Sequence, residues 1–221
     1  MNQSTDRRLP DDLRAAWSQL VPAAPDLGAE LIRRWSEPHR RYHDLRHLAE
    51  SLAALRHLGG GHEEQLAIWF HDAVFSGQPG TDEGLSAELA HDRLGRAGLP
   101  HDCCERVAQL VLITEHHRPD PRNEPECRVS DADLAVLAAE PTRYAESVAD
   151  LRTEYRHLDD AHWVAQRNTA VSSFLARSHI FTSPAGSTWE APARTNLAGE
   201  LETLSHEFSA NGNNPGSSTD Q

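Results

Sequence analysis

Apolar residues recur at helical spacing along almost the whole chain, and this periodicity constrains the fold more than any other feature. Leu45, Leu48, Leu52 and Leu55 lie on one stripe of a helix expected over 42–58, which three glycines end. The same spacing predicts further helices over 11–20, 26–36, 63–75, 83–96, 102–116, 130–139, 142–157, 160–177 and 191–208. No stretch alternates apolar and polar residues for long enough to build a sheet. The sequence therefore predicts an all-α fold.

The chain has 221 residues, with no internal repeat and no linker that would divide it. We expect a single-domain helical bundle over 11–208, flanked by a flexible N-terminus over 1–10 and a disordered polar tail over 209–221. A non-helical segment over 180–189 carries Phe181 and Trp189. These aromatic side chains could pack on the domain or on a second copy, so a homodimer stays open.

The charge balance excludes some partners. Lys and Arg number 21 against 34 Asp and Glu, which gives a net charge of −13 and argues against a general nucleic-acid surface. No run approaches the roughly 20 apolar residues of a membrane span, and the polar start does not match a secretory signal. Three cysteines are too few for a disulfide framework. We expect a cytoplasmic protein without membrane association.

Fourteen histidines stand out, and four of them precede an aspartate: His43, His71, His91 and His101. Only His71 and Asp72 lie within a strongly apolar segment, over 68–75. Since a buried carboxylate is costly unless a cation or hydrogen bonds compensate it, this pair predicts either a metal site or a hydrogen-bonded couple in the core.

Other helices offer matching side chains. His43 and His47 are four residues apart on the helix expected over 42–58 and would share one face. His117 closes the helix over 102–116, and Asp131 and Asp133 begin the next one. Imidazole and carboxylate ligands together suit Mn, Co, Ni, Fe or Zn, and Mg could also bind. Without a cysteine ligand, an open hydrolytic site is favoured over a structural zinc site.

The order of these residues resembles the HD superfamily of metal-dependent phosphohydrolases, and within it a bacterial branch of small HD proteins. That branch carries Tyr-His-x-x-x-His-Leu, here over 42–48, and Glu-x-x-Ser-Ala, here over 83–87. Further similar segments lie over 151–155, 166–177 and 193–197. The resemblance covers about residues 10 to 205, and it rests on the order and spacing of motifs that are individually weak.

The resemblance implies a metal shell of His43, His71, Asp72 and Asp131, with His47 as the competing first ligand. It also implies hydrolysis of a small-molecule phosphoester, which could be a nucleotide, by water that a divalent ion activates.

The resemblance also suggests further roles. Asp72 could take up the proton of the water, and Glu83 or His117 could protonate the leaving group. Asp82 stands where the branch usually has Asn, which leaves the role of Glu83 open. Four arginines are candidates for phosphate contacts: Arg41, Arg46, Arg152 and Arg167.

Three alternatives remain. His43-Asp-x-x-His47 looks like the zincin signature with Asp in place of Glu, but Asp is one methylene shorter and no strand is expected to align a peptide. A di-iron oxygenase would use His47 or His117 in a second ligand set. A non-catalytic HD module would bind a nucleotide without turnover.

Overall fold

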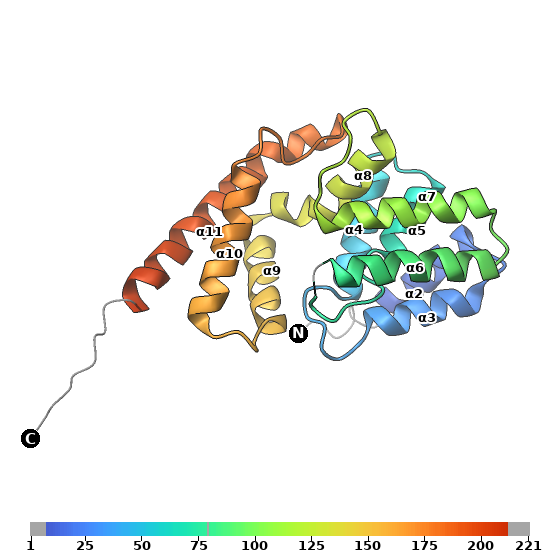
Figure 1. Ribbon diagram of the computed structural model, residues 1–221, viewed down its shortest axis with the longest axis horizontal. Helices are drawn as coiled ribbons and strands as arrows, with labels where there is room; N and C mark the ends of the chain where they lie inside the picture. The colour runs from blue at the N-terminus through green and yellow to red at the C-terminus, as the bar shows by residue number, and fades with distance from the viewer. Residues whose placement is uncertain (1–7, 79, 212–221) are drawn as a thin grey trace, which may run out of the picture.

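The computed structural model describes residues 8–78 and 80–211, with side chains up to residue 205. This part of the chain is helical and contains no strand, which confirms the all-α prediction (Figure 1). The first helix begins at Leu9 and the last ends at Asn211, so each extends slightly beyond the expected limits of the bundle. The remainder of the two expected terminal segments lies outside the described residues.

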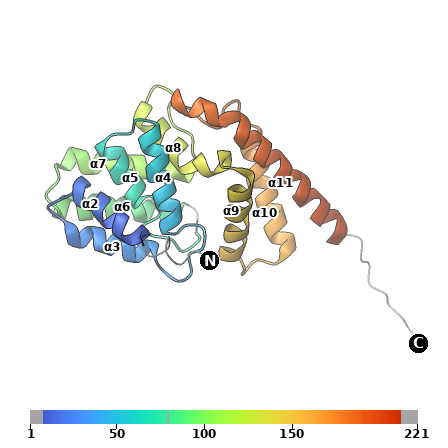
Figure 2. The same cartoon turned by 180° about the vertical axis from the view of Figure 1, so that it is seen from behind.

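The helices form two groups that lie side by side (Figures 1 and 2). The first group comprises α2 (Leu9–Leu20), α3 (Pro25–Trp35), α4 (Leu45–His57), α5 (His62–Phe70), α6 (Thr81–Arg96), α7 (His101–Leu112), the 3-10 turn η1 (Ile113–Glu115) and α8 (Glu124–Asp133). The second comprises η2 (Leu134–Ala138), α9 (Pro141–Glu154), α10 (Asp160–Leu175), η3 (Ala185–Trp189) and α11 (Glu190–Asn211). None of the described helices is both long and apolar enough to cross a membrane.

Each group has its own apolar core. Aromatic rings fill the first core, where the Trp17 and Trp69 rings meet edge to face at 5.2 Å between centroids. The second core surrounds Val171, Ile180 and Phe181. Phe181, one of the two aromatic residues that could have faced a second copy, is only 3% exposed. The other, Trp189, stacks on His57 of α4 and packs edge-on against Phe181, so it connects the two groups within one chain.

Ion pairs strengthen the junction between the groups. Arg143 of α9 binds both carboxylate oxygens of Glu50 on α4, at 2.8 to 3.2 Å. Arg46 of α4 also meets Glu146 of α9 at 2.9 Å. These contacts fix α9 beside the N-terminal half of α4, next to the candidate site.

Several helix ends differ from the predicted bounds, and three of them decide where candidate residues lie. Helix α8 begins at Glu124 rather than 130, so Asp131 and Asp133 lie near its end. Helix α4 begins at Leu45 rather than 42, because the extended Asp44 caps it by accepting the N–H groups of Arg46 and His47. Helix α5 ends at Phe70 rather than 75. His43 therefore lies on the loop before α4 and shares no helical face with His47. His71 and Asp72 lie in the turn that follows α5.

Candidate metal centre

Two buried histidines and one half-buried aspartate, from different helix ends, converge in the first group. His47 lies in the first turn of α4, His71 directly follows α5, and Asp133 is the last residue of α8. The Nε2 atoms of the two histidines are 3.1 Å apart. Asp133 Oδ1 lies 3.0 Å from Nε2 of His47 and 3.3 Å from Nε2 of His71. The three side chains could together hold a metal ion.

Asp72 brings a second carboxylate to the same point. Its Oδ2 atom lies 3.0 Å from Nε2 of His71 and 3.7 Å from Nε2 of His47. Neighbouring ligand atoms around a transition metal lie about 3.0–3.4 Å apart when each metal–ligand bond is about 2.0–2.1 Å. The spacings of 3.0 to 3.3 Å among His47, His71 and Asp133 thus fit one divalent ion, and Asp72 lies beside His71 as a further donor.

The hydrogen bonding of His71 favours a cation. Its Nδ1 atom lies 2.8 Å from the carbonyl oxygen of Ile68, which can only accept, so Nδ1 carries a hydrogen. In the neutral ring, the Nε2 lone pair then faces the carboxylates of Asp72 and Asp133. That arrangement is repulsive unless a proton or a metal ion lies between them. Metal-binding histidines commonly donate their other N–H to a backbone carbonyl in this way.

The pKa values show the same balance of charge. Burial disfavours the charged form of His71, but the carboxylates of Asp72 and Asp133 outweigh burial and raise the pKa of His71 well above its ordinary value. Conversely, the two imidazoles hold the pKa of Asp133 well below its usual range despite burial. The site therefore holds two carboxylates ionised, which suits a divalent cation.

Asp131 is not the acid that meets the histidines, contrary to the prediction. Its carboxylate accepts the backbone N–H groups of Thr182 and Ser183, at 2.9 and 2.7 Å, in the segment before η3. Residues two apart on a helix point about 200° apart around its axis, so α8 can present only one of its two aspartates to the histidines. The acidic side chain at the centre is Asp133.

His43 also lies apart from the three-residue cluster. Its Nδ1 atom is 2.6 Å from Oε2 of Glu154, at the end of α9. Its ring packs against Tyr42, Phe75 and His47, with centroid distances of 4.7, 4.3 and 5.9 Å. Of the two candidates for the first histidine, the structure brings His47 rather than His43 to His71 and Asp133.

A cavity of about 220 Å³ opens on this centre between the two groups of helices. One side is polar and is lined by Tyr42, His43, Asp72, Glu83, Thr114, His117 and Asp133. The lining from the second group of helices mixes apolar and polar side chains, namely Leu134, Val136, Leu137, Leu151 and Phe174 with Tyr144, Ser147 and Arg167. Its volume is below the roughly 300–1,000 Å³ of pockets for drug-sized ligands, so it suits a small ligand or one end of a larger one.

Both residues expected to donate protons line this cavity. Glu83 Oε2 accepts the N–H of Gly80 at the start of α6, and burial raises the pKa of Glu83. His117 has a left-handed backbone with φ of 48°, and Arg177 donates to its carbonyl oxygen at 2.8 Å. Its Nε2 atom lies 3.6 Å from Oδ2 of Asp133. Residues with strained backbones of this kind concentrate at functional sites.

Among the four expected phosphate-binding arginines, the structure places only Arg167 at the cavity. Arg167 donates to both carboxylate oxygens of buried Glu200, from Nε at 2.6 Å and from Nη2 at 3.0 Å. Arg46 pairs with Glu50 and Glu146, and Arg152 donates to two carbonyls and to Asp160. Arg41 is exposed, and its side chain donates to the carbonyl of Arg40.

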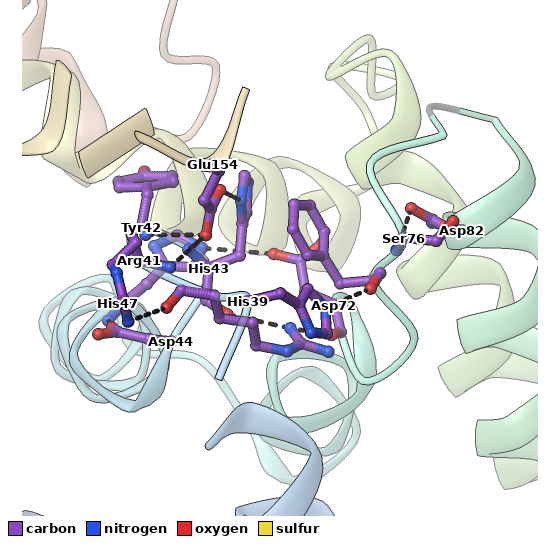
Figure 3. A network of polar contacts seen from close by, with 12 residues as sticks. His39, Arg41, Tyr42, His43, Asp44, His47, Asp72, Ser76, Asp82 and Glu154 are labelled. Atoms are coloured by element: carbon purple, nitrogen blue, oxygen red, sulfur yellow. Dashed lines mark hydrogen bonds and ion pairs between the residues drawn. The ribbon is translucent and has the colours of Figure 1, made fainter. Parts of the chain in front are cut away.

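Sequence reasoning missed two residues that hold the site together. Arg40 is 3% exposed and donates to the carbonyl oxygens of His43 and Asp72, at 3.0 and 2.8 Å. It thereby joins the loop before α4 to the turn after α5. Glu154 holds the same loop from α9 (Figure 3). Neighbouring charged residues in the sequence made both look like ordinary surface residues. Only Glu154 lies in a segment, 151–155, that contributes to the resemblance.

Comparisons with protein-family models, curated proteins and solved structures return no match. The resemblance to the HD superfamily therefore rests on the order of the motifs in this sequence.

Proposed function

We propose that the protein is a metal-dependent phosphohydrolase of the HD type that acts on a small phosphoester. The observation that supports this proposal most is the convergence of His47, His71 and Asp133, with Asp72 beside His71, next to a cavity that Asp72 and Asp133 line. Two imidazoles and two carboxylates neutralise a divalent ion while leaving coordination positions for a ligand, as hydrolytic sites require. Mn, Co, Ni, Fe and Zn suit this donor set best.

Bound at these residues, a divalent ion would activate water and neutralise charge on a phosphoryl oxygen. The protein supplies the proton acceptors and donors. Oδ1 of Asp72 has no partner within the described residues and could accept a proton from the attacking water. Glu83, whose pKa burial raises, could hold a proton for the leaving group, and His117 lies on the same wall. Leu134, Leu137 and Phe174 of the lining would pack against the organic part of the substrate.

The lining of the cavity favours a substrate with little negative charge. Asp72, Glu83 and Asp133 contribute three carboxyl groups, whereas Arg167 is the one arginine of the lining and already binds Glu200. With Glu83 protonated, a divalent ion just balances Asp72 and Asp133, so the lining has no surplus positive charge to hold further phosphates. A monophosphate or a phosphodiester therefore fits better than a polyphosphate, and a nucleoside monophosphate is the largest substrate that we propose.

The test is a panel of p-nitrophenyl phosphate, sugar phosphates and nucleoside mono- and triphosphates with Mn²⁺, Co²⁺, Ni²⁺, Zn²⁺ or Mg²⁺. The proposal expects hydrolysis of at least one phosphoester that a chelator abolishes and that added metal restores. His71→Ala should lose it, whereas His101→Ala, at an exposed residue remote from the cavity, should keep it. If the wild-type protein binds a metal ion tightly and yet cleaves none of these compounds, phosphohydrolysis is the wrong function.

A further inference from the structure

A second hollow adjoins the cavity at the candidate metal centre and is larger than it. Its volume is about 530 Å³, within the roughly 300–1,000 Å³ that ligand pockets occupy. His43, Leu151 and Arg167 line both spaces, and they come from the loop before α4, from α9 and from α10. Within the described chain, the hydrogen bonds and ring contacts of these side chains go to other residues, so none of them closes the junction.

The larger space, which we call the α9–α10 groove, lies between the end of α9 and one face of α10. Trp163, Gln166, Arg167 and Ala170 recur along α10 at spacings of three and four residues, which places them on one side of that helix. Tyr155 follows the last residue of α9, and its ring centroid lies 6.2 Å from that of Trp163. Loops of the first helix group also contribute, so the groove, like the cavity, lies between the two groups.

The lining of the α9–α10 groove differs in charge from that of the cavity. Three carboxyl groups line the cavity, whereas among the described residues no carboxyl group lines the groove, although the chain has 34 acidic residues. Aromatic rings are present instead. Tyr155 is half-buried and His157 is exposed, so both rings can reach a ligand, and such rings stack on flat aromatic groups. The groove therefore suits a planar group without positive charge.

Arg167 supplies a hydrogen-bond donor at the junction of the two spaces. Its Nε and Nη2 atoms donate to Glu200, at 2.6 and 3.0 Å, and Glu200 lines neither space. These bonds use one edge of the guanidinium, hold it in one orientation and leave the two N–H groups of Nη1 on the other side. Because Glu200 already balances the charge of Arg167, Nη1 suits a neutral acceptor, such as a carbonyl oxygen or a ring nitrogen, better than a second anion.

We propose that the α9–α10 groove binds the organic part of the substrate, a planar uncharged group with a hydrogen-bond acceptor, and that Nη1 of Arg167 selects it by donating to that acceptor. This inference rests on the proposed phosphohydrolase function, which places the phosphoryl group at the metal centre. Among the monophosphates of the panel, it favours nucleoside monophosphates over sugar phosphates of the same charge.

Phosphonates test the groove without turnover, because a phosphoesterase does not hydrolyse their C–P bond. The probes are ethylphosphonate, benzylphosphonate and the 2-, 3- and 4-acetyl derivatives of benzylphosphonate, titrated calorimetrically into the Zn²⁺-loaded full-length protein. Benzylphosphonate should bind about 10-fold more tightly than ethylphosphonate, because its ring is buried. At least one acetyl derivative should gain about another 10-fold from a hydrogen bond to a charged donor. Equal affinities for all the probes would overturn the inference.

Ala170→Phe tests the position of the ring, because the new side chain fills the groove from α10. It should lower the affinity for benzylphosphonate to that for ethylphosphonate, which should stay within about 3-fold of the wild-type value. Ala165→Phe is the matched control, since Ala165 is an exposed residue of the same helix that lines neither space, and it should bind every probe as the wild type does. Equal losses in the two variants would overturn the assignment of the groove.

Arg167→Met/Glu200→Met removes the donor and its carboxylate together, so no uncompensated charge remains buried. This double variant should lose the preference for the acetyl derivative and keep the preference for benzylphosphonate over ethylphosphonate. Arg167→Lys keeps the charge beside Glu200 but has only one nitrogen, which Glu200 engages, so it should lose the same preference. An acetyl preference that persists in both variants would overturn the role of Arg167.

Substrates complete the test. A nucleoside monophosphate should be hydrolysed with a kcat/KM at least about 10-fold above that of ribose 5-phosphate by the wild type and by Ala165→Phe, and Ala170→Phe should abolish this difference. A wild type that cleaves phosphoesters but does not distinguish the probes overturns this inference alone. A wild type that cleaves no phosphoester and binds no phosphonate shows that the proposed function is wrong, and the inference is then wrong as well.

Discussion

Asp131 and Asp133 stand two residues apart on α8 and serve opposite sides of that helix. Asp133 meets Nε2 of His47 at 3.0 Å, whereas Asp131 accepts the N–H of Ser183 at 2.7 Å in the segment before η3. One turn of helix thus contributes to the candidate metal centre and also attaches the second group of helices. The two aspartates should therefore respond differently to the same substitution.

Asp133→Asn should lower the affinity for Mn²⁺ or Zn²⁺ by more than about 100-fold, because it removes an anionic ligand from a buried site. Asp131→Asn should leave metal affinity close to that of the wild type. It should instead lower the free energy of unfolding by about 1–3 kcal/mol, since one of the buried N–H groups at 182 and 183 loses its acceptor. Isothermal titration with metal and chemical denaturation measure the two effects. The reverse ranking of metal affinities would restore Asp131 as the ligand.

The two histidines at the centre should be equivalent for metal binding. His47→Ala and His71→Ala should each abolish metal retention after gel filtration, because each removes one of the two nitrogen ligands of a small site. His101→Ala provides the control, since that side chain is 74% exposed. Elemental analysis of the purified variants gives the result. Full metal content in His47→Ala would return the role of first ligand to His43.

Gly28 tests the packing of the first core. A Cβ atom at this position would lie 2.2 Å from the Trp17 ring, whose indole N–H donates to the carbonyl of Ala24. Gly28→Ala should therefore destabilise the protein by about 1–3 kcal/mol despite the better helix propensity of alanine. Gly95→Ala in α6 is the matched control, because a Cβ atom there meets nothing within 4 Å. It should stabilise the protein by up to about 1 kcal/mol. Similar unfolding midpoints for the two variants would contradict this account of the core.

Removing only one partner of the buried ion pair between Arg167 and Glu200 should strongly destabilise the protein. Their side chains are 14% and 6% exposed, and Tyr144 donates a further hydrogen bond to Glu200. Arg167→Met should lower the free energy of unfolding by about 3–5 kcal/mol, because it leaves Glu200 buried without its cation. The double variant Arg167→Met/Glu200→Met should recover much of that loss. Urea denaturation of the three proteins gives the comparison, and a double variant as unstable as Arg167→Met would rule out an uncompensated charge as the cause.

Periodicity predicted the helices well because most of them bury one apolar face. It also placed His71 and Asp72 correctly in an apolar environment, since the neighbouring Trp69 and Phe70 are 1% and 0% exposed. It could not locate the end of α5, because the apolar residues continue from the helix into the turn that carries Asp72. A run of apolar residues indicates which part of the chain is buried. Here the buried segment continues beyond the last residue of helix α5.

The positions of the site residues depend on where each helix begins and ends, and the apolar pattern does not define those ends to within one turn. Asn123 caps α8, which begins at Glu124, so Asp131 and Asp133 lie near the end of a helix rather than at the start of one. The capping role of Asp44 likewise separates His43 from the helix that carries His47. Glu154 lies 111 residues from His43, and no local pattern reveals a contact that depends on how α9 packs.

The most direct test is anomalous diffraction from crystals of the full-length protein grown with Mn²⁺ or Zn²⁺. The account predicts one strong peak about 2.0–2.3 Å from Nε2 of His47, Nε2 of His71 and a carboxylate oxygen of Asp133, with Asp72 completing the protein ligands. A peak bound by His43 and Asp131 instead, or crystals soaked in metal that show no peak beside His71, would contradict it.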